Sequence, residues 1–282
     1  MKKTTTPATL KAPIVLKPPK RRILVFDVET TGLIPNMDPI TKEYKSLEEM
    51  PNIIQLSFIV FNLYEFCIER TYNAYIKIKN IEKISEEITN LTGITQEKCL
   101  NEGIEMKDAL IEFYNEYINS DYVIAHNINF DKRMIMFELE RNFLEIEEKC
   151  PFILNIFNPI FCKSKRIENY CTMMASIHIC NILIEKKSKK ISNKMATDVS
   201  VAPVEPLGSE SIIMPLTPPT FYKKFPKLSE LYFCLFQSNP ENLHNSLVDT
   251  LVCLRCFLKI KMNHEIHDKK YDFMLKTVME MV

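Results

Sequence analysis

The chain has 282 residues, of which 46% are hydrophobic, and its 36 basic side chains balance its 36 acidic ones. This composition is ordinary for a soluble globular protein, and the length fits one large domain or two small ones. The chain has no apolar run of about 18 residues, which a membrane helix needs, and its first residues lack the apolar run of a secretory signal, so we expect no membrane segment and no secretion.

Positive charge is concentrated at the start of the chain. Residues 1–22 hold seven basic residues and no acidic one, which leaves 29 basic against 36 acidic side chains elsewhere. A basic arm on an acidic body is common in proteins that contact a polyanion, although a solvated tail has the same composition. We predict that residues 1–20 are disordered, and KPPKRR at 17–22 fits either a nuclear address or a phosphate-binding arm.

The cysteines bear on the compartment. There are nine, an odd number, and they are scattered along the chain. This usage favours a reducing environment over a disulfide framework. We therefore expect an intracellular protein, in the cytoplasm or the nucleus.

The first half of the chain predicts strands before helices. Residues 22–28 indicate a buried strand, and 34–52, which contain three prolines, indicate a loop. Residues 53–61 (IIQLSFIVF) and 67–78 indicate two more strands, so that the three form an antiparallel meander. The segment EMKDALIEFYNEYIN at 105–119 has apolar residues at helical spacing.

The second half alternates strand and helix. YVIA at 122–125 predicts a short buried strand and 129–143 a helix, while 150–185 is ambiguous between short helices and strands. Residues 186–220 lack periodicity and predict a long flexible insertion. Helices are then expected in three places: from about Pro226, over 246–262 and over 268–281.

This order of elements predicts an α/β fold. Strands first, and strand and helix in alternation afterwards, are typical of a mixed β-sheet flanked by helices. We expect a single domain over 21–262 and a C-terminal helical extension over 263–282.

Two carboxylates interrupt the end of the first strand. Asp27 and Glu29 are two residues apart in LVFDVETTGL, so their side chains point to the same face of the strand. Anions placed together repel each other unless a cation lies between them, and hard divalent cations prefer such oxygen ligands. An exposed strand end is the simpler alternative for this pair alone.

Two further segments carry similar residues. VIAHNINFD ends the second buried strand with His126 and Asn127, and Asp131 follows. LHNSLVDT places His244 five residues before Asp249, at the entry to the last long helix, where Asn245 can cap the helix. Each acid also has a simpler reading, since an Asp at a helix start stabilises the helix dipole.

Taken in order, the three segments resemble the motifs of the DEDDh exonucleases, the DnaQ-like branch of the ribonuclease H-like fold. The resemblance covers roughly residues 22–262. The matching motifs are Asp27-Val28-Glu29-Thr30-Thr31-Gly32-Leu33, then His126-Asn127-x-x-Phe130-Asp131, and then His244-x4-Asp249. One departure is Cys171-Thr172, where the family usually has Asp-Thr.

The resemblance implies a metal-dependent 3′→5′ exonuclease that acts on nucleic-acid 3′ ends, with DNA preferred and RNA possible, and releases nucleoside 5′-monophosphates. The acids Asp27, Glu29, Asp131 and Asp249 would hold two Mg²⁺ or Mn²⁺ ions, and His244 would take a proton from water as the general base. The residues that would contact the terminal nucleotide are Thr30, Thr31, Gly32, Leu33, His126 and Asn127.

Two alternatives stay open from the sequence. One is an RNA-trimming enzyme of the same fold, and the other is a nucleic-acid-binding subunit with a silent site. All five catalytic positions hold the expected residue, which argues against silence. A polymerase or replication partner is a further expectation that comes only from the resemblance.

Overall fold

A computed structural model describes residues 21–41, 45–78, 84–186 and 220–281. The predicted basic tail over 1–20 lies outside the described residues, and so does nearly all of the predicted insertion at 186–220. No described helix is long and apolar enough to cross a membrane.

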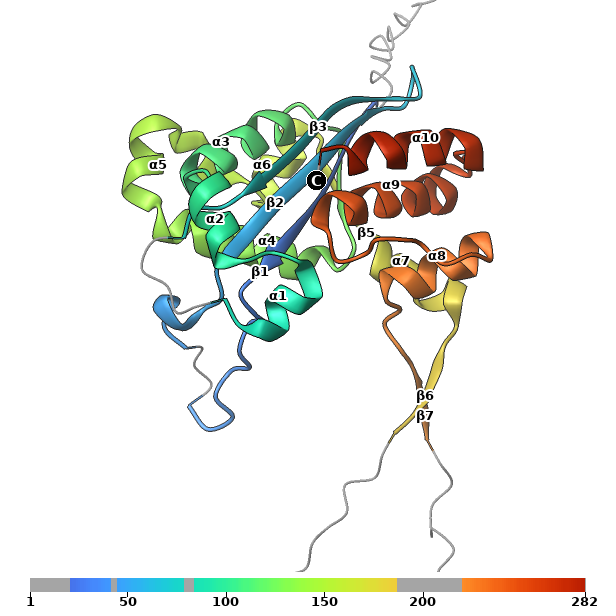
Figure 1. The fold of residues 1–282 in the computed structure, drawn as a ribbon, viewed down its shortest axis with the longest axis horizontal. Helices are drawn as coiled ribbons and strands as arrows, with labels where there is room; N and C mark the ends of the chain where they lie inside the picture. The colour runs from blue at the N-terminus through green and yellow to red at the C-terminus, as the bar shows by residue number, and fades with distance from the viewer. Residues whose placement is uncertain (1–20, 42–44, 79–83, 187–219, 282) are drawn as a thin grey trace, which may run out of the picture.

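A five-stranded mixed sheet forms the centre of the protein (Figure 1). Its strand order is β3-β2-β1-β4-β5, with antiparallel pairing from β1 to β3 and parallel pairing of β1 with β4 and of β4 with β5. The predicted meander is therefore confirmed. The strands are β1 (Arg22–Thr30), β2 (Ile53–Asn62), β3 (Cys67–Tyr75), β4 (Tyr122–Ala125) and β5 (Glu168–Cys171).

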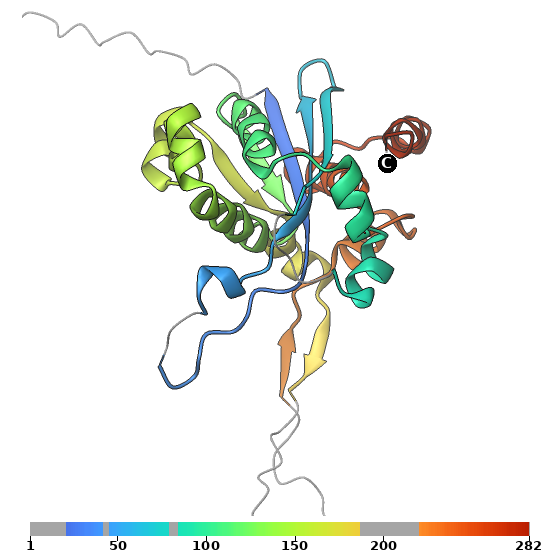
Figure 2. The same ribbon diagram turned by 60° about the vertical axis from the view of Figure 1, so that its left-hand side comes forward.

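Helices cover both faces of this sheet, as the α/β prediction requires (Figures 1 and 2). The regular helices are α1 (Glu86–Thr92), α2 (Gln96–Glu102), α3 (Met106–Tyr117), α4 (Ile128–Arg141), α5 (Phe143–Lys149), α6 (Pro159–Lys165), α7 (Thr172–Cys180), α8 (Leu228–Phe236), α9 (Ser246–Met262) and α10 (Asp268–Met279). Two short 3₁₀ helices are η1 (Leu47–Glu49) and η2 (Pro151–Asn155).

The alternation of side chains along β1 separates two hydrophobic cores. Leu24, Phe26 and Val28 pack on one face with residues of α3 and α4. Ile23 and Val25 point the other way and pack with residues of α8, α9 and α10. Since β1 is buried on both faces, it reads as a continuous apolar run until its last residues.

The C-terminal helix α10 is tied to the second core through a buried cation. Arg255 on α9 is 2% exposed, donates hydrogen bonds to the Tyr232 hydroxyl and to Asp268, and lies over the rings of Phe236 and Tyr271. A buried charge is tolerated when it is paired in this way. The predicted C-terminal extension is thus helical and packs on α9.

Several short elements were not predicted. Helix α1 begins at the N-cap Ser85, whose side chain accepts a hydrogen bond from the Ile88 backbone, and ends at Gly93 with φ +72°. Ser at the N-cap and Gly at the C-cap are the usual signals of a short helix. The ambiguous stretch 150–185 contains both kinds of element: η2, α6, β5, α7 and the short strand β6 (Leu183–Glu185).

Strand β6 pairs with β7 (Phe221–Lys223) to form a separate two-stranded antiparallel ribbon. Figures 1 and 2 show this ribbon projecting from the body at the end of the sheet where the chain leaves β1. Strand β6 follows α7 and precedes the predicted insertion, and β7 follows the insertion and leads to α8.

Candidate active site

The first two acids follow the apolar residues of one face of β1. Asp27 and Glu29 continue the series begun by Ile23 and Val25, so they point to the face that α9 covers. Both are half-buried. The strand that buries its apolar residues against α9 therefore presents two carboxylates to the start of the same helix.

The third acid is placed by the N-terminus of α9. Asn245 is the N-cap, and its side-chain oxygen accepts hydrogen bonds from the backbone N–H groups of Leu247 and Val248 at 3.1 and 3.4 Å. The capping role predicted for Asn245 is confirmed. Asp249 lies in the first turn, which the predicted helix start also required.

These three acids form one cluster. Asp27, Glu29 and Asp249 each offer a carboxylate oxygen, and the three oxygens lie within 4.8 Å of one another, a group that could hold a metal ion. In addition, Asp249 Oδ1 is buried without a hydrogen-bond partner among the described residues. An orphaned carboxylate oxygen in a cluster of anions fits a cation ligand.

The electrostatics of the cluster agree with this geometry. Burial, and then the charges of Asp249 and Asp131, raises the pKa of Glu29 to about 8. Burial also raises the pKa of Asp249 to about 7, against the lowering effect of a backbone hydrogen bond from His244. The pKa of Asp27 lies well above its usual range because of burial and then the charges of Asp131, Asp249 and Glu29.

Asp131 lies beside this cluster on the first turn of α4. It is 3% exposed and is not one of the three residues within 4.8 Å. Its charge nevertheless raises the pKa of both Asp27 and Glu29, and burial raises its own pKa to about 8. Asn127, in the left-handed region at φ 67°, turns the chain from β4 into α4 and so directs Asp131 to the site.

His244 lies in the loop that enters α9. It is exposed, has φ +71°, and its backbone N–H donates to Asp249 Oδ2 at 3.3 Å. This contact ties the loop to the third acid. The interaction involves the backbone, so it leaves the imidazole ring available for other partners.

His126 is engaged by the protein itself. Its Nε2 lies 3.0 Å from the Pro226 carbonyl oxygen, which only accepts, so Nε2 carries the proton. Burial lowers the pKa of His126 to about 4, so the ring is neutral near pH 7 and Nδ1 accepts from the Thr172 hydroxyl at 3.0 Å. His126 thus links the end of β4 to the starts of α7 and α8. Its partner Thr172 belongs to the Cys171-Thr172 pair, which stands where the family usually has Asp-Thr.

The strip after β1, residues 30–33, combines positions held by hydrogen bonds with positions that border open space. The Thr30 hydroxyl donates to the Gly32 carbonyl, and Thr31 exchanges two hydrogen bonds with the Asn52 backbone. A Cβ at Gly32 would meet no atom within 4 Å, and Leu33 is 84% exposed. The threonines therefore hold the turn, while Gly32 and Leu33 border open space.

Sequence reasoning missed a polar network beneath the acids. Gln55 and Ser57 are the β2 partners of Glu29 and Asp27, and both donate to the Asn73 side-chain oxygen, at 2.7 and 2.9 Å. Ser246 on α9 hydrogen-bonds Ser57, which links the helix that carries Asp249 to the sheet. The sequence feature that could have indicated this network is the glutamine and the serine inside the otherwise apolar run IIQLSFIVF.

A second missed feature fixes the loop between β1 and β2. The Arg141 guanidinium donates to the Glu138 carboxylate and to backbone carbonyls of the loop, and Glu138 accepts from the Ile53 N–H. The carbonyls belong to Leu47, Met50 and Pro51. Both charges lie on α4, so the helix that carries Asp131 also holds the loop that leaves the site.

Comparisons with known proteins agree with the motifs. The family model described as exonuclease matches residues 24–158, which include Asp27, Glu29 and Asp131. A PolC-type DNA polymerase III of Ureaplasma parvum is 36% identical over 113 residues, 40% of this chain and 7% of that protein. The 3′-5′ exonuclease DinG of Bacillus subtilis is 30% identical over 122 residues, 43% of this chain and 11% of that protein.

Among solved structures, E. coli exonuclease I in complex with a dT13 oligonucleotide has a TM-score of 0.51, with 12% identity over 93% of this chain and 46% of that chain. This likeness shows the fold alone. The chain spans about a tenth of the length of the curated relatives it matches. Residues 24–158 match the exonuclease family model, and the mixed sheet flanked by helices has the fold of exonuclease I, as the resemblance of the three motifs predicted.

Proposed function

We propose that this chain is a metal-dependent 3′→5′ exonuclease that releases nucleoside 5′-monophosphates from the 3′ ends of DNA. The observation that carries the proposal is the cluster of Asp27, Glu29 and Asp249 within an exonuclease-family domain. Three acids from two separate elements meet there, which is costly for the fold unless a cation joins them.

The residues fit a divalent cation. The donor set is made of carboxylate oxygens, one of them orphaned, which suits Mg²⁺ or Mn²⁺ better than a soft metal. Asp27, Glu29 and Asp249 would hold one ion, and Asp131 beside them would complete a site for two. When bound, such ions would supply charge stabilisation at the scissile phosphate.

His244 is the proposed general base. The hydrogen bond from its backbone to Asp249 holds the loop at the site, and the ring is on an exposed residue that water can reach. The imidazole would accept a proton from the attacking water at a ring nitrogen. Asp249 then has two roles: it supplies a cation ligand and it anchors the loop that carries the base.

The strip after β1 is the proposed binding surface for the terminal nucleotide. Open space at Gly32 would let the substrate approach the backbone, and the exposed Leu33 offers apolar surface to a base. The Thr30 and Thr31 side chains would hold this strip in place. By the same proposal, Asn127 would border the pocket and His126 would act as a positioning residue, because both its ring nitrogens are engaged.

DNA is the proposed substrate because the relatives' names concern DNA polymerases and because the neighbouring exonuclease I holds a dT13 oligonucleotide. A polymerase partner is proposed on the same ground, since the match covers only a small part of the PolC-type proteins.

The test is digestion of matched 5′-labelled DNA and RNA, single- and double-stranded, with Mg²⁺ or with EDTA. We expect shortening of DNA from its 3′ end in Mg²⁺, with 5′-monophosphate products, and none in EDTA or with Asp27→Asn. Preferred digestion of RNA would replace DNA with RNA as the substrate. Binding without cleavage in Mg²⁺ and Mn²⁺ would make the chain a binding subunit and overturn the proposal.

A further inference from the structure

The β6–β7 ribbon presents aromatic side chains to solvent. Phe221 is 58% exposed, Tyr222 is 53% exposed, and Phe225, which follows the ribbon, is 56% exposed. Neighbouring residues on a strand point to opposite faces, so each face of the ribbon carries an aromatic ring. Large exposed rings are unfavourable on a free surface and mark a contact surface when they gather.

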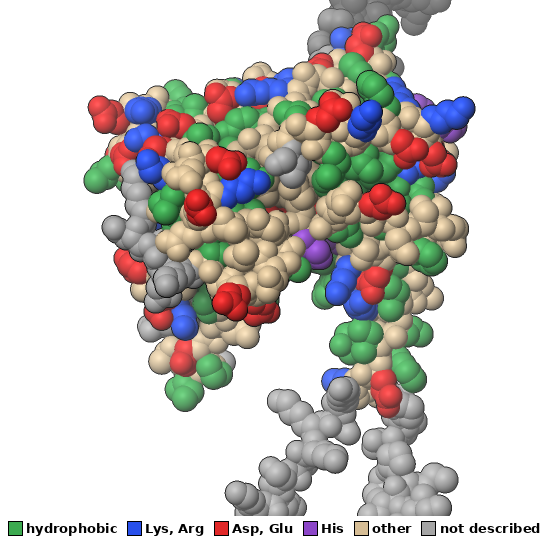
Figure 3. Space-filling model, viewed as in Figure 1, with side chains coloured by type: hydrophobic (Ala, Val, Ile, Leu, Met, Phe, Trp, Pro, Cys, Tyr) green, Lys and Arg blue, Asp and Glu red, His purple; other side chains and the backbone are tan. Residues whose placement is uncertain are grey.

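Positive charge lies among these rings. The ribbon and its foot, residues 183–186 and 220–230, contain four lysines, Lys186, Lys223, Lys224 and Lys227, against Glu185 and Glu230. Lys224 pairs with Glu230, and Lys223 donates a hydrogen bond to Nδ1 of His178 on α7. Figure 3 shows lysine or arginine and hydrophobic side chains together along the ribbon.

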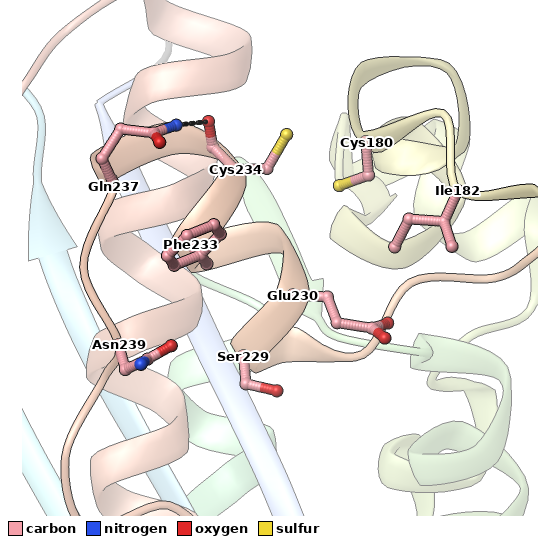
Figure 4. A pocket seen from close by; sticks show the side chains of 8 residues that line it. All are labelled: Cys180, Ile182, Ser229, Glu230, Phe233, Cys234, Gln237 and Asn239. Atoms are coloured by element: carbon pink, nitrogen blue, oxygen red, sulfur yellow. Dashed lines mark hydrogen bonds between the residues drawn. The ribbon is translucent and has the colours of Figure 1, made fainter.

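The foot of the ribbon continues this surface. A pocket of about 420 Å³ lies there between the end of α7 and α8 (Figure 4). Ile182, whose carbonyl accepts from the Lys224 backbone, and Phe233, which is 48% exposed, line it. Apolar surface therefore extends from the ribbon onto the body.

The ribbon is connected directly to the candidate active site. Phe225 is followed by the buried Pro226, whose carbonyl accepts the hydrogen bond from His126 Nε2. His126 directly follows β4, beside the turn that places Asp131. The aromatic surface thus begins one residue away from a contact of the active-site scaffold, at the end of the sheet where the chain leaves β1 (Figures 1 and 2).

We propose that the β6–β7 ribbon binds single-stranded nucleic acid on the 5′ side of the cleaved nucleotide, by stacking of bases on Tyr222, Phe225 and Phe221 and by contact of phosphates with the lysines. Alternating rings and cations suit a strand whose bases and phosphates alternate. This inference rests on the proposed function, since it extends the substrate of the same site.

The experiment measures binding in EDTA, which separates it from cleavage. Fluorescence anisotropy with labelled dT oligomers of about 15 and about four nucleotides is run on wild type and on Tyr222→Ala/Phe225→Ala. We expect the Kd of the long oligomer to rise about thirtyfold in the double variant and that of the short one to change little, since each of the two stacked bases contributes at the lower end of the usual range at exposed rings. A matching uridine series separates DNA from RNA.

Two controls sharpen the result. Phe273→Ala removes a ring that is 71% exposed on α10, away from the ribbon, and should bind both lengths like wild type. Tyr222→Trp/Phe225→Trp keeps rings that can stack, so it should retain the wild-type affinity for the long oligomer.

Three outcomes would overturn the proposal. The first is an unchanged Kd for the long DNA oligomer in the alanine variant, and the second is an equal loss of affinity for both DNA lengths. The third is that the wild-type protein sediments as a multimer, which dissociates in the variant while DNA binding persists. The last outcome would make the ribbon a contact between copies of the chain. A wild type that binds the long oligomer through the ribbon but cleaves nothing would contradict the proposed function alone.

Discussion

The acid cluster should cost stability whenever no cation fills it, and Asp249→Asn tests this. The variant keeps the shape of the side chain and an oxygen that can accept from the His244 N–H, but it removes one negative charge. Burial raises the pKa of Asp249 from 3.8 to about 7, so ionising it at pH 8 opposes folding. We therefore expect the variant to be more stable than wild type in EDTA at that pH.

The size of the effect follows from linkage. A rise from 3.8 to about 7 corresponds to roughly 4 kcal/mol at about 1.36 kcal/mol per unit. Two effects reduce this figure: neighbouring carboxyls share protons with Asp249, and the variant loses the favourable interaction of its charge with the α9 dipole, about 0.5 kcal/mol. We therefore expect the variant to be more stable than wild type by about 2 kcal/mol. For a chain of this size that is about 4–8 °C in Tm.

The sign of the pH dependence is also fixed. A carboxyl whose folded pKa is raised imposes no penalty below its unfolded pKa, near 4, and destabilises the fold increasingly as pH rises to the folded value. Between about pH 4 and pH 8, the window set by Glu29, Asp131 and Asp249, wild type in EDTA should lose stability that Mg²⁺ restores.

The assay is thermal unfolding at pH 5 and pH 8, in EDTA and in Mg²⁺. In Mg²⁺ the order should reverse, because the variant has lost a ligand. Asp108→Asn is the matched control, since Asp108 is an exposed acid in the first turn of α3, and it should lose only the small helix-dipole contribution. The reasoning is refuted if Asp249→Asn melts at or below wild type in EDTA at pH 8, or if Mg²⁺ stabilises both proteins equally.

Three other predictions concern single contacts or segments. His244→Ala should lower turnover about 10²–10⁴-fold while Mg²⁺ still raises the Tm, and near wild-type turnover would remove His244 as the base. Thr172→Val should leave His126 Nδ1 buried without a donor and lower the Tm by about 2–12 °C, for a cost of about 1–3 kcal/mol; an unchanged melting curve would show that the hydrogen bond adds nothing. Deletion of residues 1–20 should flatten the salt dependence of DNA binding without changing turnover at saturating substrate, and an equal salt slope would contradict a role for that segment in binding.

The main elements could be predicted from sequence because their signals are local. The helix predicted over 246–262 is Ser246–Met262, and the strand predicted over 53–61 is Ile53–Asn62. Apolar spacing sets the type of such elements, and a cap such as Asn245 sets the boundary. The short helix α1 has no buried side chain and α2 has one, Cys99, so neither has an apolar periodicity from which it could be predicted.

The acids of the site could be predicted as candidates, but their arrangement could not. Spacing alone places Asp27 and Glu29 on one face; it does not place Asp131 or Asp249 against them, because that depends on how α4 and α9 pack. The contacts of His126 were also invisible, since Thr172 and Pro226 are 46 and 100 residues away. Buried polar side chains find such distant partners only once the fold exists.

The register of β1 is what joins fold and site. A shift of one residue would send Asp27 and Glu29 to the face of α3 and α4 and bring Val28 to α9, so the apolar residues Ile23 and Val25 fix where the acids point. The pairing with β2 then changes register between Glu29 and Thr30. Such an irregularity bends a strand and redirects its end. The irregularity directly follows Glu29, so the chain leaves the sheet beside the acid cluster. Gly32 and Leu33 then lie at the edge of that cluster.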